Sequence, residues 1–131
     1  MNVLLDTHAL LWALYFPDNL GEQAKAIISD PSNDVVVSAA SIWEIEIKHA
    51  KKPDLMPYSA KKILVGCERA GYSIMSVKPE HILLLASFMD QGIHNDPFDH
   101  LLLSTARCEG LMLLTHDELM GRYQGVAAIR C

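Results

Sequence analysis

The segment HNDPFDHLLLSTA (residues 94–106) places two aspartates at the start of a leucine-rich run. Asp96 before Pro97 is typical of a helix N-cap, because its carboxylate can accept hydrogen bonds from backbone N–H groups of the first turn. Asp99 is then the third residue of the helix, the position at which a capping box has its Glu or Gln. The residues three, four and seven positions after Asp99 are leucine or alanine, which puts this carboxylate in the apolar stripe of the helix. A carboxylate there must be paired, neutralised or bound to a cation, so Asp99 is a candidate metal ligand.

Two further acids stand where a parallel sheet would bring them close to Asp99. Asp6 ends the apolar run VLLD, and Asp117 follows the run LMLLTH. Sites in open parallel sheets lie beyond the C-terminal ends of the strands. Each acid alone could instead cap the following helix, with Thr7 or Thr115 beside it. Gathered at one edge, such carboxylates supply the hard oxygen ligands that Mg²⁺ or Mn²⁺ requires.

The segment SIWEIEIK offers a fourth acid, and the sequence leaves two choices for it. An apolar arc that includes Trp43 also contains Glu46, whereas Glu44 lies towards Lys48 and Lys51. Helical periodicity does not decide between the two glutamates.

These acids need a scaffold, and the pattern of the chain predicts one. Apolar runs predict strands at 2–6, 34–39, 72–77, 111–115 and 126–130. Between them, helices are predicted at 7–14, 17–31, 40–52, 57–71, 78–92 and 96–110, with Asp18 or Asn19 as the cap of the second. Strands that alternate with helices, and are apolar throughout, indicate an α/β fold whose parallel sheet is covered on both faces.

Composition limits the remaining possibilities. The chain has 131 residues, half of them hydrophobic and 21% charged, which is typical of one soluble globular domain over residues 1–131. The apolar start lacks a basic segment, and no apolar run approaches the ~20 residues of a membrane span. The three cysteines form no CxxC pair and predict neither disulfides nor a zinc site. We therefore expect a cytoplasmic protein.

The formal net charge of −5 argues against binding nucleic acid through bulk positive charge. The basic residues are nevertheless clustered, because six of the eleven fall between positions 48 and 69. This run predicts either a basic patch beside the acidic cleft or an ordinary solvated helix face, and the sequence leaves both open.

Four segments occur in the order and spacing of the PIN-domain nucleases, and the chain resembles most the VapC-type toxins of bacterial toxin–antitoxin pairs. The segments are LLDTHALLW, SAASIWEIEIK, HNDPFDHLLLSTA and LLTHDELM. The resemblance extends over nearly the whole chain. It implies a PIN-like fold, with a central parallel sheet of about five strands flanked by helices on both faces. It also implies a Mg²⁺- or Mn²⁺-dependent endoribonuclease that cleaves single-stranded RNA and leaves 5′-phosphate and 3′-hydroxyl ends.

The resemblance also assigns the acids. Four of them match the catalytic, metal-binding carboxylates of the family: Asp6, Glu44, Asp99 and Asp117. Asp96 is then a cap or a supporting residue, and Thr7 and Thr115 are either hydrogen-bond donors to the ligands or simple caps. Two departures stand out, since His100 occupies a position where relatives usually carry Arg, and Glu46 is an additional acid.

The same resemblance implies two protein partners, a second copy of the chain in a homodimer and a cognate antitoxin. The antitoxin would insert a basic residue among the carboxylates, and arginine fits best because it pairs with carboxylates bidentately. Two alternatives stay open. The chain could be an acid-lined binding module for a basic segment, without turnover, or another Mg²⁺ phosphohydrolase. A dehalogenase-type phosphatase is disfavoured because Asp6 is followed by Thr7 and His8 rather than by a DxD pattern.

Other notable side chains have structural interpretations. Trp12 and Trp43 have the spacing of core residues, whereas Phe98 is the better candidate for stacking on a base. Cys67 and Cys108 are expected in the core. The histidines at positions 8, 94, 100 and 116 lack HExxH spacing, so we expect loop and helix-start residues rather than zinc ligands.

Overall fold

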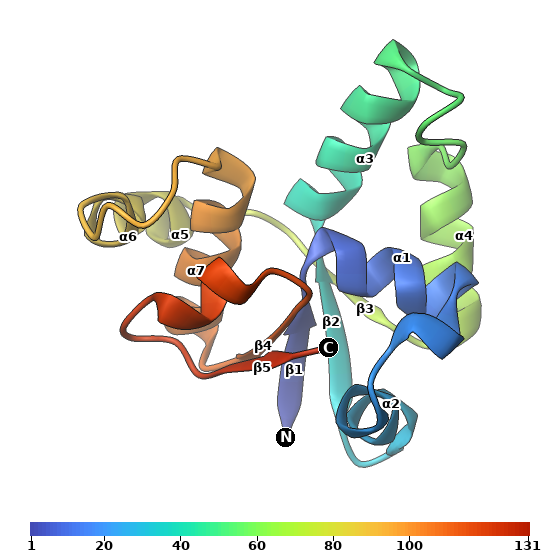
Figure 1. Cartoon of the computed structure of the whole chain (residues 1–131), viewed down its shortest axis with the longest axis horizontal. Helices are drawn as coiled ribbons and strands as arrows, with labels where there is room; N and C mark the ends of the chain where they lie inside the picture. Colours follow the sequence, from blue (N-terminus) through green and yellow to red (C-terminus); the bar gives the residue numbers. More distant parts are fainter.

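The computed structural model describes residues 1–131 and has a five-stranded sheet at its centre (Figure 1). The strand order is β3-β2-β1-β4-β5, and all four pairings are parallel. The strands are β1 (Asn2–Leu5), β2 (Asp34–Ser38), β3 (Ser73–Met75), β4 (Met112–Thr115) and β5 (Ala128–Arg130). The predicted α/β fold is therefore confirmed, although β3 and β5 are shorter than the apolar runs indicated.

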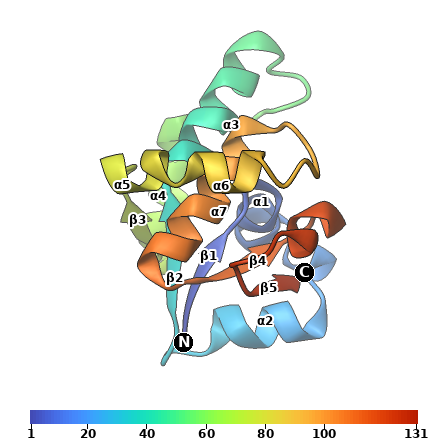
Figure 2. The same ribbon diagram turned by 90° about the vertical axis from the view of Figure 1, so that its left-hand side faces the viewer.

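Helices cover both faces of this sheet, as Figures 1 and 2 show together. One face packs against α1 (Thr7–Tyr15), α2 (Glu22–Ser29), α3 (Ala39–Lys51) and α4 (Ala60–Ala70). The other face is covered by α5 (Pro79–Leu83), α6 (Leu85–Met89) and α7 (Pro97–Glu109). Two 3₁₀ turns complete the chain, η1 (Pro17–Asn19) and η2 (Glu118–Arg122).

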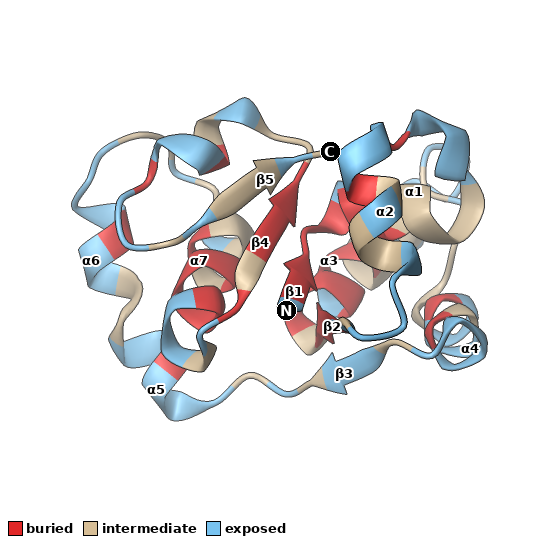
Figure 3. Ribbon diagram, turned by 90° about the horizontal axis from the view of Figure 1, so that it is seen from below, coloured by how far each residue is buried: buried red, intermediate tan, exposed pale blue.

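The core is divided by the sheet into two apolar clusters. Along β1, Val3 and Leu5 point into the cluster under α1–α4, while Leu4 points into the cluster under α7. This alternation follows from the two-residue period of a strand, and burial on both faces explains why the strand sequence is apolar throughout. Figure 3 shows the result, since β1 and β4 are largely buried while the edge strand β3 is exposed.

Two predicted helices are broken in the structure. The prediction of one helix over 17–31 was wrong, because Leu20 is extended (ψ 140°) and buried between η1 and α2. The N-cap of α2 is Gly21, so neither Asp18 nor Asn19 caps it. The helix predicted over 78–92 is interrupted at Leu84, whose φ and ψ of −85° and −8° lie in the sparsely populated bridge region.

The helix that begins at Pro97 matches its prediction closely. Asp96 is its N-cap, and Gly110, with a φ of +65°, ends it in the left-handed conformation that glycine adopts at little cost. These end signals fix which residues form the first turn of α7, and so they fix the positions of Asp96 and Asp99 in that turn. None of the helices combines the length and the apolar character that a membrane crossing requires.

Candidate metal centre

A polar cavity of about 480 Å³ opens beyond the C-terminal ends of β1 and β4, where the sheet topology predicts a site. None of its eleven lining residues is hydrophobic. They are Asp6, Thr7, His8, Glu44, Lys48, Asp96, Asp99, His116, Asp117, Glu118 and Arg130. All four acids assigned as ligands from the sequence line this cavity. Only Lys48 and Arg130 carry a permanent positive charge against six acids, so the cavity favours cations.

Asp6 is the most enclosed of these acids, with 5% of its surface exposed. Its Oδ1 accepts a hydrogen bond from the backbone N–H of Ala9 (2.7 Å) and so caps α1. Its Oδ2 accepts from Thr115 Oγ1 (2.6 Å) and from the backbone N–H of His116 (3.0 Å). Burial raises the pKa of Asp6, and the three hydrogen bonds oppose that rise. Asp6 therefore both joins β1 to β4 and presents a carboxylate at the cavity.

Asp96 and Asp99 have different roles in the structure. Oδ1 of Asp96 accepts from the backbone N–H groups of Phe98 (2.9 Å) and Asp99 (3.3 Å), so this residue alone caps α7. The carboxylate of Asp99 instead lies in the cavity, where Oδ2 contacts Nε2 of His94 at 2.9 Å. Burial raises the pKa of Asp99 to about 6, the hydrogen bond from His94 lowers it, and the charges of Asp96 and Asp6 raise it further. Like-charge repulsion among the acids is therefore secondary to desolvation.

The structure places Glu44, and not Glu46, in the cavity. Glu44 is 8% exposed, and its carboxylate accepts from Thr7 Oγ1 (2.6 Å) and pairs with Lys48 Nζ (2.7 Å). Glu46 accepts from the backbone N–H of Ala60 (3.0 Å) and supports the start of α4. Helical periodicity put Glu46 in the apolar arc of this helix. In the structure, the buried side of α3 contains Glu44 instead.

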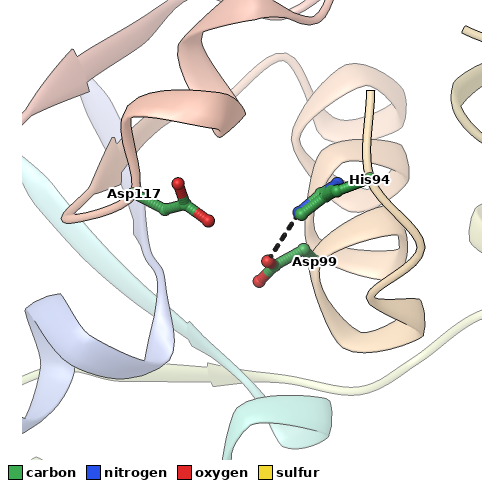
Figure 4. Close-up of side chains that lie close together, drawn as sticks. All are labelled: His94, Asp99 and Asp117. Atoms are coloured by element: carbon green, nitrogen blue, oxygen red, sulfur yellow. Dashed lines mark hydrogen bonds and ion pairs between the residues drawn. The ribbon is translucent and has the colours of Figure 1, made fainter. Parts of the chain in front are cut away.

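Asp117 faces Asp99 across the cavity, as Figure 4 shows. Its Oδ1 caps η2 by accepting from the backbone N–H of Leu119 (2.8 Å). Ligand atoms of His94, Asp99 and Asp117 all lie within 4.8 Å of one another. His94 lies in a loop, as the sequence predicted, but its contact with Asp99 was not predicted, because a spacing of five residues in a loop matches no helical or metal-binding pattern.

The two threonines lie where they can hold the carboxylates in place. Thr7 donates to Glu44 and Thr115 donates to Asp6, which ties the junction of β1 and α1 to α3 and to the end of β4. A short hydroxyl–carboxylate hydrogen bond fixes the orientation of the acid and favours its ionised form.

Two expectations about other residues need correction. Trp43 is not a core residue, because 61% of its surface is exposed and its ring contacts that of Phe98 at a centroid distance of 5.2 Å. Cys108 is exposed, whereas Cys67 is buried as expected. His100 lies near the start of α7, as expected, and is buried outside the cavity lining.

The donor set of the cavity fits a hard divalent cation. Oδ1 of Asp99 and Oδ2 of Asp117 accept no hydrogen bond from the protein, while the other oxygen of each is engaged. Burial raises the pKa of Asp99 to about 6, and the hydrogen bond and charge of His94 offset only part of that rise. Free carboxylate oxygens on opposite sides of a polar cavity are the ligands that Mg²⁺ and Mn²⁺ prefer.

We expect Mn²⁺ to raise the melting temperature of the metal-free protein, because the cation binds the assembled acids and not the unfolded chain. At a concentration 100 times the dissociation constant, the gain in the free energy of unfolding is about 2.7 kcal/mol. Differential scanning fluorimetry with Mn²⁺ and then excess EDTA measures this, with NaCl at equal ionic strength as the control. An unchanged melting temperature at millimolar Mn²⁺ would contradict a site at these acids.

Comparisons with known proteins agree with this architecture. The fold is shared by a chain in the crystal structure of VapBC2 from Rickettsia felis bound to a DNA fragment from the VapBC2 promoter. The TM-score is 0.75 at 16% sequence identity, and the match covers 100% of this chain and 99% of that chain. DNA-bound VapBC from Salmonella typhimurium gives a TM-score of 0.71 at 14% identity, covering 99% and 98%. FitAcB from Neisseria gonorrhoeae gives 0.62 at 22%, covering 98% and 96%.

Comparison with curated protein sequences gave no match. The PIN domain family, in contrast, matches the sequence over residues 3–126, a range that contains all four acids, the strands β2, β3 and β4, and all but the first residue of β1. The chain therefore belongs to the PIN domain family, as its sequence motifs indicated.

Proposed function

We propose that this protein is a metal-dependent endoribonuclease that cleaves single-stranded RNA and acts as the toxin of a type II toxin–antitoxin pair. The observation that carries the proposal is the cavity in which Asp6, Glu44, Asp99 and Asp117 meet at the C-terminal edge of the sheet. Membership of the PIN domain family supports a hydrolase acting on phosphodiester bonds. The structural neighbours named above are VapBC and FitAcB complexes, which supports a toxin role.

In this proposal the four acids divide the work of holding Mg²⁺ or Mn²⁺. Asp99 and Asp117 offer free oxygens, while Asp6 and Glu44, held by Thr115 and Thr7, complete the negative cavity or act through water. Bound there, the cation would lower the pKa of a water molecule and neutralise the leaving 3′-oxygen of the RNA.

In this proposal, the positively charged side chains at the cavity wall orient the substrate phosphate. Lys48 pairs with Glu44, and Arg130 lies 3.8 Å from Glu118, so both side chains are held at the wall. Lys51 and Lys52 continue the positive charge of Lys48 along the end of α3, around a second, smaller hollow. This arrangement supports the interpretation of the basic run as a local patch beside the acidic cavity.

An aromatic pair next in sequence to cavity residues, the exposed Trp43 and the half-buried Phe98, supports a preference for single strands. Trp43 directly precedes Glu44 and Phe98 directly precedes Asp99, and the two rings contact each other at a centroid distance of 5.2 Å. An unpaired base can stack on such a ring, whereas the bases of a duplex are not available to it.

We expect Trp43→Ala to weaken the binding of a single-stranded oligoribonucleotide by about 1–3 kcal/mol, the usual value of one base–aromatic stack. Fluorescence anisotropy in EDTA, which prevents metal-dependent cleavage, measures the affinity. Phe16→Ala is the matched control, since Phe16 is an exposed aromatic residue that, unlike Trp43, is not next in sequence to a cavity residue. Equal affinities for wild type and Trp43→Ala would rule out stacking at this pair.

The proposal includes two protein partners. A cognate antitoxin would place a basic residue, best an arginine, between the acids, because the cavity has six acids and two fixed positive charges. A homodimer would cover the apolar side chains that α5 and α6 expose, which include Ile82, Leu83 and Met89. Light scattering after size-exclusion chromatography should then give twice the chain mass of 14.6 kDa. We also propose that residues 1–131 form a single PIN-like domain.

The function is tested by incubating the purified chain with single-stranded RNA, duplex RNA and single-stranded DNA, each with Mg²⁺, Mn²⁺ or EDTA. Cutting of single-stranded RNA alone, and only with metal, is the expected result. If no nucleic acid is cut while an arginine-containing peptide still binds the acids, the chain is a binding module and not a nuclease.

A further inference from the structure

We propose that His94 is a positioning residue, which holds the carboxylate of Asp99 ready for the cation and is itself held by Tyr123 and His100. This inference rests on the proposed metal site and adds to it a supporting group that the four-acid assignment does not contain. The three supporting residues come from the loop before α7, from α7 itself and from the end of η2.

Both ring nitrogens of His94 have partners. Nδ1 lies 2.6 Å from the hydroxyl of Tyr123, and Nε2 lies 2.9 Å from Oδ2 of Asp99. The Tyr123 oxygen also accepts from the backbone N–H of His94 (3.2 Å), and its own hydrogen has two acceptors within reach, Nδ1 of His94 at 2.6 Å and the carbonyl oxygen of His94 at 3.3 Å. The shorter contact favours donation to Nδ1. When the tyrosine donates to Nδ1, the ring hydrogen must lie on Nε2, so that His94 donates to Asp99.

His100 fixes the backbone of the same loop. Its Nε2 lies 2.8 Å from the carbonyl oxygen of His94, which can only accept, so the hydrogen of His100 is on that nitrogen. Tyr123 and His100 are each only 3% exposed, and the tyrosine ring packs near Phe88 at a centroid distance of 6.1 Å. The position of His94 is therefore set by two buried side chains.

The arrangement places His94 beside Asp99, at the edge of the cavity. Asp99 lines the cavity and His94 does not, and Figure 4 shows the imidazole directed at the Asp99 carboxylate, with Asp117 on the opposite side. The hydrogen bond occupies Oδ2 of Asp99 and leaves Oδ1 for the cation. A carboxylate ligand held in this way has its orientation fixed before metal binds, so the cation does not have to order it.

The test is Mn²⁺ affinity, measured by calorimetry at pH 7.5 without RNA. His94→Phe keeps a ring but removes the donor, and we expect a loss of about tenfold or more, the usual cost of removing the partner of a metal ligand. His94→Gln keeps an N–H near the position of Nε2 and should restore most of the affinity. Tyr123→Phe removes one hydroxyl and should give an intermediate loss. His49→Phe is the control, because His49 bonds the carbonyl of Met56 away from the cavity.

Spectroscopy separates positioning from direct ligation. His94 Nε2 is close enough to Asp117 and Asp99 to join them around an ion, and it would then produce a ¹⁴N coupling in the electron spin echo of bound Mn²⁺. We expect no such coupling in the wild type; a coupling that disappears in His94→Gln would overturn the positioning role. Unchanged Mn²⁺ affinity in a folded His94→Phe would also overturn it, while leaving the proposed function intact. Failure of the wild type to bind Mn²⁺ would contradict the proposed function itself, and this inference with it.

Discussion

Asp99→Asn should abolish metal-dependent RNA cleavage without lowering the melting temperature of the metal-free protein. The variant removes a charged ligand from the cavity, and losing several kcal/mol of transition-state stabilisation lowers the rate on the order of 10³-fold. The free energy of unfolding of the metal-free protein, in contrast, should not fall. Burial raises the pKa of Asp99 to about 6, so the ionised carboxylate at pH 7 opposes folding. Asparagine is neutral, has the same shape, and its oxygen still accepts from His94.

Asp96→Asn is the matched control for this result, because it makes the same change three residues earlier. Asparagine caps helices as well as aspartate does, so α7 should keep its start. We expect a much smaller loss of cleavage than in Asp99→Asn. Initial rates on one oligoribonucleotide, together with thermal melts in EDTA, provide the comparison. Equal losses in the two variants would contradict the separation of capping from metal binding.

Acidification should weaken metal binding steeply below about pH 6. Protons and the cation compete for Asp99, whose pKa is raised to about 6 by burial, so Mn²⁺ affinity should be nearly constant above pH 7. Below pH 6 it should fall about tenfold per pH unit, or roughly 30-fold at pH 4.5, from this single carboxylate. The pKa of Asp6 is also raised by burial, which makes the fall steeper.

For the protein without metal, acidification has the opposite effect and stabilises the fold. Because the pKa of Asp99 is higher in the folded state than its ordinary value of 3.8, protonation of this residue stabilises the metal-free fold as the pH falls through about 6. Calorimetric Mn²⁺ titrations from pH 7.5 to 4.5 test the affinity, with Asp99→Asn expected to give a flatter and weaker profile. A wild-type affinity at pH 5 equal to that at pH 7.5 would contradict competition at this carboxylate.

The sheet and the placement of two acids could be predicted because they depend on local patterns. Asp6 and Asp117 each follow a strand that is apolar throughout, and the topology of a parallel sheet brings such strand ends to one edge. The division between Asp96 and Asp99 follows from helical periodicity within a single helix. The broken helices at Leu20 and Leu84 could not be predicted in this way, because tertiary packing overrode good helical patterns.

The rest of the candidate site depends on packing that no local pattern contains. Glu44 and Glu46 are separated only by which face of α3 meets the sheet, and the exposure of Trp43 follows from the same choice. Tyr123 reaches His94 from 29 residues away in sequence. Contacts of this kind are set by the assembled fold.

The chemical ends of the RNA products test the central claim most directly. Carboxylates that hold a cation and direct water at the phosphate leave 5′-phosphate and 3′-hydroxyl ends, and we predict these ends with Mg²⁺ or Mn²⁺ and no products in EDTA. The cavity is also lined by the imidazoles of His8 and His116, which could act as acid and base on the RNA 2′-hydroxyl without metal. Products with 2′,3′-cyclic phosphate ends, formed equally well in EDTA, would contradict the metal-dependent mechanism and move the chemistry from the acids to these histidines.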